Sequence, residues 1–101
     1  MARGAEPYEE TRPSLIVQND VGNRVADDVI IVPITKTIKG LPFMVRVPLG
    51  EGGLNYESCV DCAAIFTIPK DRLGDKIGQL PASRMNEVNR ALCVSLGIPR
   101  P

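Results

Sequence analysis

The sequence predicts a mainly β domain of the α+β class: a small antiparallel barrel with one amphipathic helix packed on it at the C-terminal end. Three observations support this prediction. Short apolar runs rich in β-branched residues recur before Pro81, glycine- and proline-containing segments separate them, and beyond Pro81 the apolar period changes to three or four residues. Strands followed by one terminal helix are typical of this architecture.

Length and composition predict a single domain spanning residues 1–101, with a modest core. Hydrophobic residues make up 44% of the chain and charged residues 24%, the balance of an ordinary globular protein. The 12 Lys and Arg equal the 12 Asp and Glu in number, so any contact with nucleic acid must come from a local basic cluster. No apolar run approaches the ~20 residues that span a bilayer, and the N-terminus lacks the apolar core of a secretory signal. We therefore expect a cytoplasmic protein without a membrane partner.

Two apolar runs in the first third of the chain are expected to pair as strands of one buried sheet. They are LIV at 15–17 and VIIV at 29–32, and the polar, turn-forming segment 19–28 separates them. Arg12 stands just before the first run and Thr35 just after the second. A hairpin-like pairing would therefore bring a permanent cation and a hydroxyl to the same rim of the sheet.

The remaining elements before the helix follow from local patterns. Residues 1–10 show no periodicity and should form a loop. Pro33 cannot donate to a ladder, so the end of the second strand should lie at an edge or at a bulge. Residues 43–47 alternate between apolar and other side chains, with Arg46 facing solvent. We further expect a polar turn at 36–42, a flexible loop at 48–55, a strand at 58–67, one helical turn at 70–73 and a short last strand at 76–80.

The predicted helix covers the segment between Pro81 and Leu96. Its start is marked by Ser83 or by Pro81, and its end by Gly97 and Pro99. Charged side chains at positions 84, 87 and 90 lie off the apolar stripe, which should cover the open side of the sheet. The stripe is made of Met85, Val88, Leu92 and Leu96.

Three cysteines and the absence of histidine argue against a metal centre. Cys59 and Cys62 form a CxxC pattern, but residues three apart on a strand point to opposite faces and cannot share one ion. Only Cys93 remains, so a four-ligand zinc site would need carboxylates to complete it. We expect buried structural thiols and no metal.

Four ordered blocks of the chain, between about Gly4 and Ile98, resemble the successive blocks of the MazF/PemK family, the toxins of bacterial type II toxin–antitoxin pairs. The blocks are TRPSLIVQNDVGN, VIIVPIT, KGLPFMVRVPLGEGGL and KDRLGDKIGQLPASRMNEVNRALCVSLGI. The resemblance implies a Src-homology-3-like barrel of the plasmid-maintenance-toxin, or CcdB-like, type. It also implies a homodimer that cleaves single-stranded RNA at short sequence motifs without a metal or cofactor, and a MazE-like antitoxin that neutralises it.

Arg12 and Thr35 match the arginine of the family's RP motif and the hydroxyl residue that closes its PIT motif. The resemblance implies catalytic roles for both: Arg12 in proton transfer and phosphate contact, Thr35 in a hydrogen bond to phosphate oxygens. A planar guanidinium suits bidentate contact with phosphate. From the residues alone, the alternative is that Arg12 pairs with Glu9 or Glu10 and that Thr35 only ends a strand.

Further RNA contacts are expected from a short list of side chains. Where the family has a DQIRT-like strand, this chain has AAIFT, so Phe66 replaces a basic residue. Phe66 is either a core side chain or a platform on which a base stacks, and Tyr8 and Tyr56 are further candidates for stacking. The predicted RNA-binding residues are Glu6, Lys36, Lys39, Arg46 and Phe66.

The sequence departs from the family at its beginning, where the strand that normally precedes the RP motif is missing. An unpaired sheet edge is the expected consequence. This departure leaves a second hypothesis open: a non-catalytic remnant that binds antitoxin or dimerises, or a binding module like the gyrase poisons of the same fold.

Overall fold

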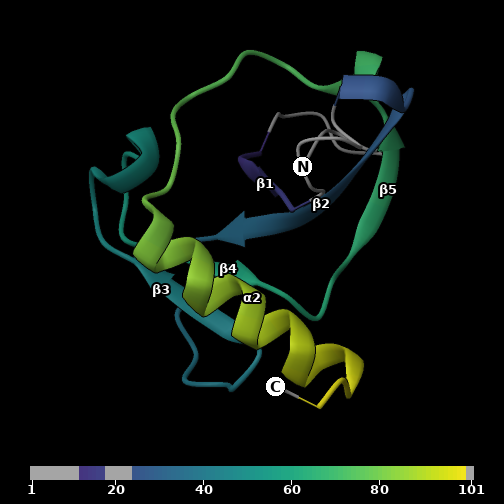
Figure 1. The fold of residues 1–101 in the computed structure, drawn as a ribbon. Helices are drawn as coiled ribbons and strands as arrows, with labels where there is room; N and C mark the ends of the chain where they lie inside the picture. The colour runs from purple at the N-terminus through teal and green to yellow at the C-terminus, as the bar shows by residue number, and fades with distance from the viewer. Residues whose placement is uncertain (1–11, 18–23, 100–101) are drawn as a thin grey trace.

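The structure of the chain is a computed structural model that describes residues 12–17 and 24–99. The predicted loop at 1–10 and the first half of the predicted turn at 19–28 lie outside these residues. Figure 1 shows a bent sheet with one long helix crossing β3 and β4. The elements are β1 (Ser14–Ile16), β2 (Asp28–Thr35), β3 (Met44–Val47), the 3-10 turn η1 (Glu51–Gly53), β4 (Ser58–Asp61), β5 (Phe66–Pro69), the 3-10 turn η2 (Lys70–Arg72) and α2 (Ala82–Leu96).

All pairings in the five-stranded sheet are antiparallel, and β2 is its central strand. On one side β2 pairs with β1, with Leu15 opposite Val32. On its other side the first half of β2 pairs with β5, and its last two residues pair with β4, which in turn pairs with β3. The predicted fold class and the predicted pairing of the two N-terminal apolar runs are thus confirmed.

Pro33 lies in a strand that is paired on both sides, so of the two positions expected from the sequence, an edge or a bulge, the edge is wrong. Ile34 donates its N–H to the carbonyl of Pro13 at 3.1 Å, so the alternation along β2 turns the nitrogen of Pro33 away from β1. On that side the partner of β2 changes from β5, which ends opposite Ile31, to β4, which starts opposite Ile34. Proline is tolerated inside a central strand because its missing N–H falls where the partner strand changes.

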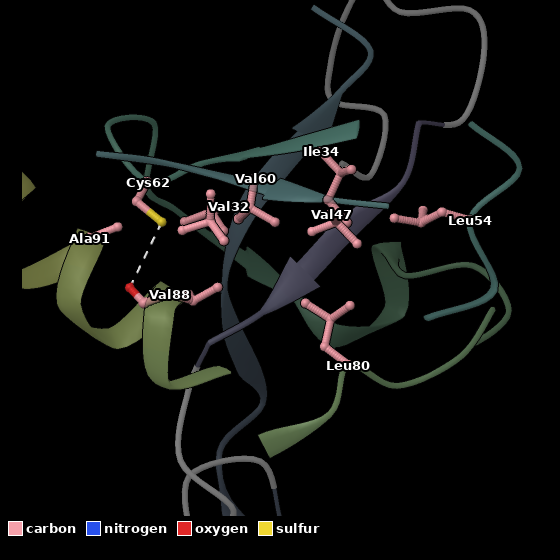
Figure 2. Close-up of a cluster of buried hydrophobic side chains, with 10 residues drawn as sticks. Val32, Ile34, Val47, Leu54, Val60, Cys62, Leu80, Val88 and Ala91 are labelled. Atoms are coloured by element: carbon pink, nitrogen blue, oxygen red, sulfur yellow. Dashed lines mark hydrogen bonds between the residues drawn. The ribbon is translucent and has the colours of Figure 1, made fainter. Parts of the chain in front are cut away.

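The core lies between the sheet and α2 (Figure 2). From the helix, Val88 and Ala91 are buried, whereas Leu96, the last residue of the predicted stripe, is 58% exposed. The helix follows Pro81 and ends at Gly97, whose φ of 69° is left-handed, so both predicted boundaries hold. The buried core residues are Val32, Ile34, Val45, Val47, Leu54, Val60, Cys62, Leu80, Val88 and Ala91.

The predicted strand at 58–67 is two strands, β4 and β5. The break occurs where the Asp61 carboxylate accepts the N–H of Ala63 at 3.0 Å, a side-chain turn that competes with the ladder. The predicted one-turn helix at 70–73 is present as η2.

The predicted last strand at 76–80 is absent, because this segment packs edge-on against η1. A Cβ on Gly78 would collide with the carbonyl of Gly52, and one on Gly53 would collide with the carbonyl of Ile77. Glycine is needed at both positions for the two backbones to touch. The segment therefore packs against η1 and adds no strand to the described sheet.

The cysteines behave largely as expected from the sequence. Cys59 is 1% exposed and Cys62 is completely buried, whereas Cys93 is partly exposed. Cys59 lies in β4, opposite Thr35 of β2. Cys62 lies just past the end of β4 in the core, where its Sγ is 4.0 Å from the carbonyl oxygen of Val88. Burial, with a contribution from the Asp61 carboxylate, raises the pKa of the Cys62 thiol to about 11.

Candidate active site at the rim of the sheet

The register of β1 and β2, continued beyond Ser14, places Arg12 opposite Thr35. Ser14 lies opposite Pro33, and the hydrogen bond from Ile34 to Pro13 continues the ladder by one step. The next step places Arg12 opposite Thr35, as a pair without backbone hydrogen bonds, whose Cα atoms are typically about 4.5 Å apart. Side chains of such a pair leave the same face of the sheet. The register therefore supports the expected juxtaposition, while the catalytic roles of the two residues stay a prediction.

The Thr35 hydroxyl is held by its own turn. Its Oγ1 accepts the N–H of Thr37 at 3.1 Å, which fixes the oxygen at the end of β2. A hydroxyl that accepts one hydrogen bond still has its O–H to donate. The side chain is half-buried, and the side chain of Arg12 is exposed, so a phosphate could meet a fixed donor and a cation at the same rim.

The pair begins a cross-strand row that continues over the sheet. Thr35 lies opposite Cys59, and Cys59 lies opposite Arg46 on β3. Arg46 is exposed as predicted, but its Nη2 and Nε both lie 2.7 Å from Oε2 of Glu57. Its charge is therefore partly committed to a carboxylate, which weakens the case for a direct phosphate contact by Arg46.

The other predicted RNA-binding residues come from several parts of the chain. Lys36 follows Thr35 directly, and its Nζ is 4.1 Å from the centroid of the Tyr56 ring. Lys39 is exposed in the segment that follows β2. Phe66 is 44% exposed, so it is not the core side chain that one interpretation of the sequence expected. Glu6 lies outside the described residues.

Phe66 shares the face of the Arg12–Thr35 pair. It lies opposite Ile31, which precedes Thr35 by four positions on the same strand. Because strand side chains alternate, residues an even number apart point to one side. At about 3.3 Å per residue, the two positions are roughly 13 Å apart along β2. The distance suits contacts to different nucleotides of one RNA strand.

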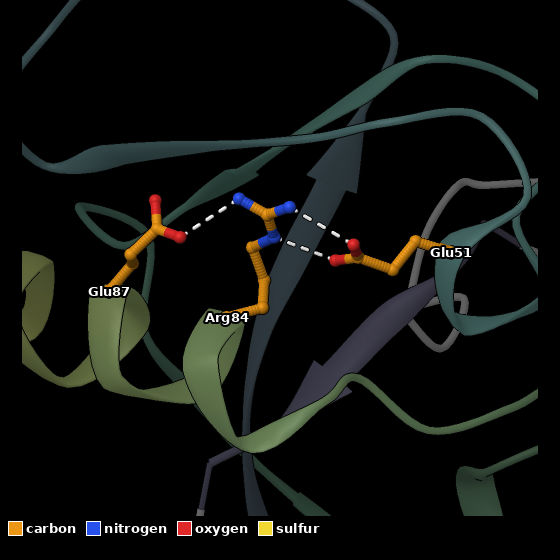
Figure 3. A network of polar contacts seen from close by, with 3 residues as sticks. All are labelled: Glu51, Arg84 and Glu87. Carbon is orange, nitrogen blue, oxygen red and sulfur yellow. Dashed lines mark hydrogen bonds and ion pairs between the residues drawn. The ribbon is translucent and has the colours of Figure 1, made fainter.

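An ion-pair cluster that the sequence did not suggest fixes the loop between β3 and β4 (Figure 3). Arg84 of α2 donates from Nε and Nη2 to the two carboxylate oxygens of Glu51 at 2.7 and 3.0 Å, and from Nη1 to Glu87 at 2.8 Å. The hydrogen bond with Arg84 lowers the pKa of Glu51, and the same bond raises the pKa of Arg84. The loop predicted to be flexible is thus tied to the helix by a bidentate contact.

The residues that the structure describes contain neither a metal-binding cluster nor a membrane-spanning helix. Among residues 12–17 and 24–99, no group of three or more His, Cys, Asp or Glu side chains could hold a metal ion. Within the same ranges, no helix combines the length and the apolar character that crossing a membrane requires.

Comparisons of the sequence and the structure with known proteins find members of one toxin family. The family model of PemK-like, MazF-like toxins of type II toxin–antitoxin systems matches residues 2–96. The endoribonuclease MazF1 of Mycobacterium bovis is 37% identical over 90 residues, which cover 89% of this chain and 83% of the relative. The solved structure of the Mycobacterium tuberculosis toxin MazF-mt6 has a TM-score of 0.84 at 34% identity, covering 90% of this chain and 91% of its own. A mycobacterial endoribonuclease solved in complex with its cognate antitoxin also has a TM-score of 0.84, at 32% identity, and covers 100% of this chain and 99% of its own.

Proposed function

The chain belongs to the family of PemK-like, MazF-like toxins of type II toxin–antitoxin systems, and from this premise we propose that it is an endoribonuclease acting through Arg12 and Thr35. Its substrate is single-stranded RNA, chiefly mRNA, which it cuts at a short sequence motif in the cytoplasm. The observation that carries the assignment of the two residues is their position opposite each other at the end of the β1–β2 ladder.

The reaction begins with attack of the ribose 2′-oxygen on the adjacent phosphorus. The P–O5′ bond breaks, the 2′-hydroxyl proton leaves and the 5′-oxygen gains a proton, so the products carry a 2′,3′-cyclic phosphate and a 5′-hydroxyl. Negative charge accumulates on the non-bridging oxygens in the transition state. Donors fixed in place before the reaction stabilise this charge most effectively, because they need not reorganise.

Arg12 supplies a positive charge and several N–H donors at the rim of the sheet. A guanidinium can contact two phosphate oxygens at once, and it strengthens its hold as charge develops on them. Thr35 donates its O–H to one of the same oxygens while Thr37 fixes the position of Oγ1. Proton transfer at the 2′- and 5′-oxygens is assigned to Arg12 by the resemblance to the family.

Partners follow from the same relatives. We propose that the chain forms a homodimer, as the resemblance to the family implies, and that it binds a MazE-like antitoxin. The complex of a mycobacterial endoribonuclease with its cognate antitoxin supports the second part of this proposal. The alternative of a non-catalytic binding remnant is disfavoured, because the chain has both Arg12 and Thr35, and the β1–β2 register continued to Arg12 supports their pairing at one rim.

The proposed activity is tested by incubating the purified chain with a long single-stranded RNA in EDTA and mapping fragment ends by primer extension. We expect discrete cuts that disappear when the 2′-hydroxyl at the cut site is replaced by hydrogen. Intact RNA, from a protein whose circular dichroism shows that it is folded, would refute the proposal.

A further inference from the structure

Tyr56 lies at the same end of the sheet as the proposed active site, although it is distant from Thr35 in sequence. The ammonium of Lys36, the residue after Thr35, sits 4.1 Å from the centroid of the Tyr56 ring. Tyr56 also precedes by three positions Cys59, which pairs with Thr35 in the ladder. β2 ends at Thr35 and β4 begins at Ser58, so Lys36 and Tyr56 meet at the end of the β2–β4 pair that carries Thr35, and RNA that crosses this rim could reach the ring.

The Tyr56 side chain is available to a ligand. It is 57% exposed, and the core of the described residues does not include it. A cation over one face of an aromatic ring uses that face alone. The opposite face is the kind of surface on which nucleobases stack in proteins that bind single strands.

The backbone around Tyr56 is anchored at both ends. Two residues earlier, Leu54 is 7% exposed and accepts the N–H of Gly50 at 2.9 Å through its carbonyl. Two residues later, the buried Ser58 donates its hydroxyl to the carbonyl of Tyr56 itself at 2.9 Å. A ring on such a short anchored span loses little conformational entropy when a base stacks on it.

The charges around the ring also suit a polyanion. Glu57, the next residue, would repel phosphates, but its carboxylate is held at 2.7 Å by Arg46. Lys36 contributes a positive charge at the ring itself. The surroundings of Tyr56 are therefore not dominated by negative charge, and a backbone phosphate could approach it.

We propose that Tyr56, backed by Lys36, is a base-stacking subsite for a nucleotide one or two positions from the cleaved phosphate. Stacking is tolerant of sequence but scales with the size of the base, so the subsite should favour a purine. This inference rests on the proposed function, because it assumes that RNA lies across the rim that carries Arg12 and Thr35.

The test uses RNA oligonucleotides that contain the mapped cleavage motif, with a 2′-hydrogen at the cut position so that they bind without being cleaved. We expect Tyr56→Ala to weaken binding about tenfold, in the lower part of the range for losing one base stack, and Tyr56→Phe to bind like the wild type. Leu49→Ala is the matched control, because Leu49 is 66% exposed on the same loop and lies away from the ring contact.

An abasic scan of the same oligonucleotides identifies the base. One abasic position should cost the wild type about tenfold in affinity and cost Tyr56→Ala almost nothing, since the stack is already lost in that variant. Equal penalties in both proteins at every position, or unchanged affinity of Tyr56→Ala, would overturn the subsite while leaving the nuclease intact. A wild-type chain that neither binds nor cuts RNA would overturn the proposed function, and this inference with it.

Discussion

Thr35→Val removes one hydroxyl from the candidate site and little else. Valine has nearly the same shape as threonine and favours strands, so the end of β2 should persist. The hydroxyl accepts the N–H of Thr37, which is exposed and can turn to water, so the free energy of unfolding should fall by less than ~1 kcal/mol. In the transition state the lost interaction is a hydrogen bond to a charged oxygen, typically about 1.5–3 kcal/mol. At about 1.4 kcal/mol per factor of ten, this slows cleavage roughly 10- to 150-fold.

The measurement is single-turnover cleavage of an RNA containing the preferred motif, at saturating enzyme, together with a urea melt of each protein. Thr35→Ser keeps the hydroxyl and should cut within a few-fold of the wild-type rate. A Thr35→Val enzyme that cuts as fast as the wild type would refute the assigned phosphate contact. A large loss of stability in the melt would instead show that Thr35 is needed for the fold.

Three further predictions concern the fold and its titrations. Val88→Ala removes two methyl groups from a fully buried side chain and should destabilise the protein by about 2 kcal/mol in urea, whereas Leu96→Ala, at a 58% exposed residue, should change the free energy of unfolding by less than ~0.5 kcal/mol. The pKa of Cys62 is raised to about 11, so its thiol should resist a thiol reagent at pH 8 until the protein unfolds; equal labelling of native and unfolded protein, located by mass spectrometry, would contradict this. Arg84 lowers the pKa of Glu51 in the folded state, so the stabilisation is present above the ordinary carboxyl pKa of 4.5 and is lost as pH falls through the folded value. Glu51→Gln should therefore lower the urea midpoint at pH 7, with the difference from wild type vanishing at strongly acidic pH, and a pH-independent difference would argue against the ion pair.

The strand pairing and the candidate site could be predicted because their signals are local. The two apolar runs are rich in β-branched residues, and each is flanked by the polar residue of interest. Once the runs pair as antiparallel strands, the register decides what meets at the rim. Arg12 and Thr35 are therefore brought together by a pairing that the pattern alone suggests.

The missed features depend on contacts that no local pattern records. The run at 58–67 has no glycine or proline, and its break comes from the Asp61 carboxylate capturing the N–H of Ala63. The contact of Arg84 with Glu51 joins residues 33 positions apart, so only the packing of α2 against the loop reveals it. The exposure of Phe66 likewise depends on its pairing with β2 and not on its own apolar character.

The central claim is that this chain cuts RNA with Arg12, and it is tested most directly by comparing the wild type with Arg12→Ala on one long single-stranded RNA in EDTA. Arg90→Ala is the matched control, because it removes an exposed arginine from α2. We predict metal-independent cuts at one motif for the wild type and for Arg90→Ala, and their disappearance in Arg12→Ala, with all three proteins equally folded by circular dichroism. Undiminished cleavage by Arg12→Ala would contradict the account.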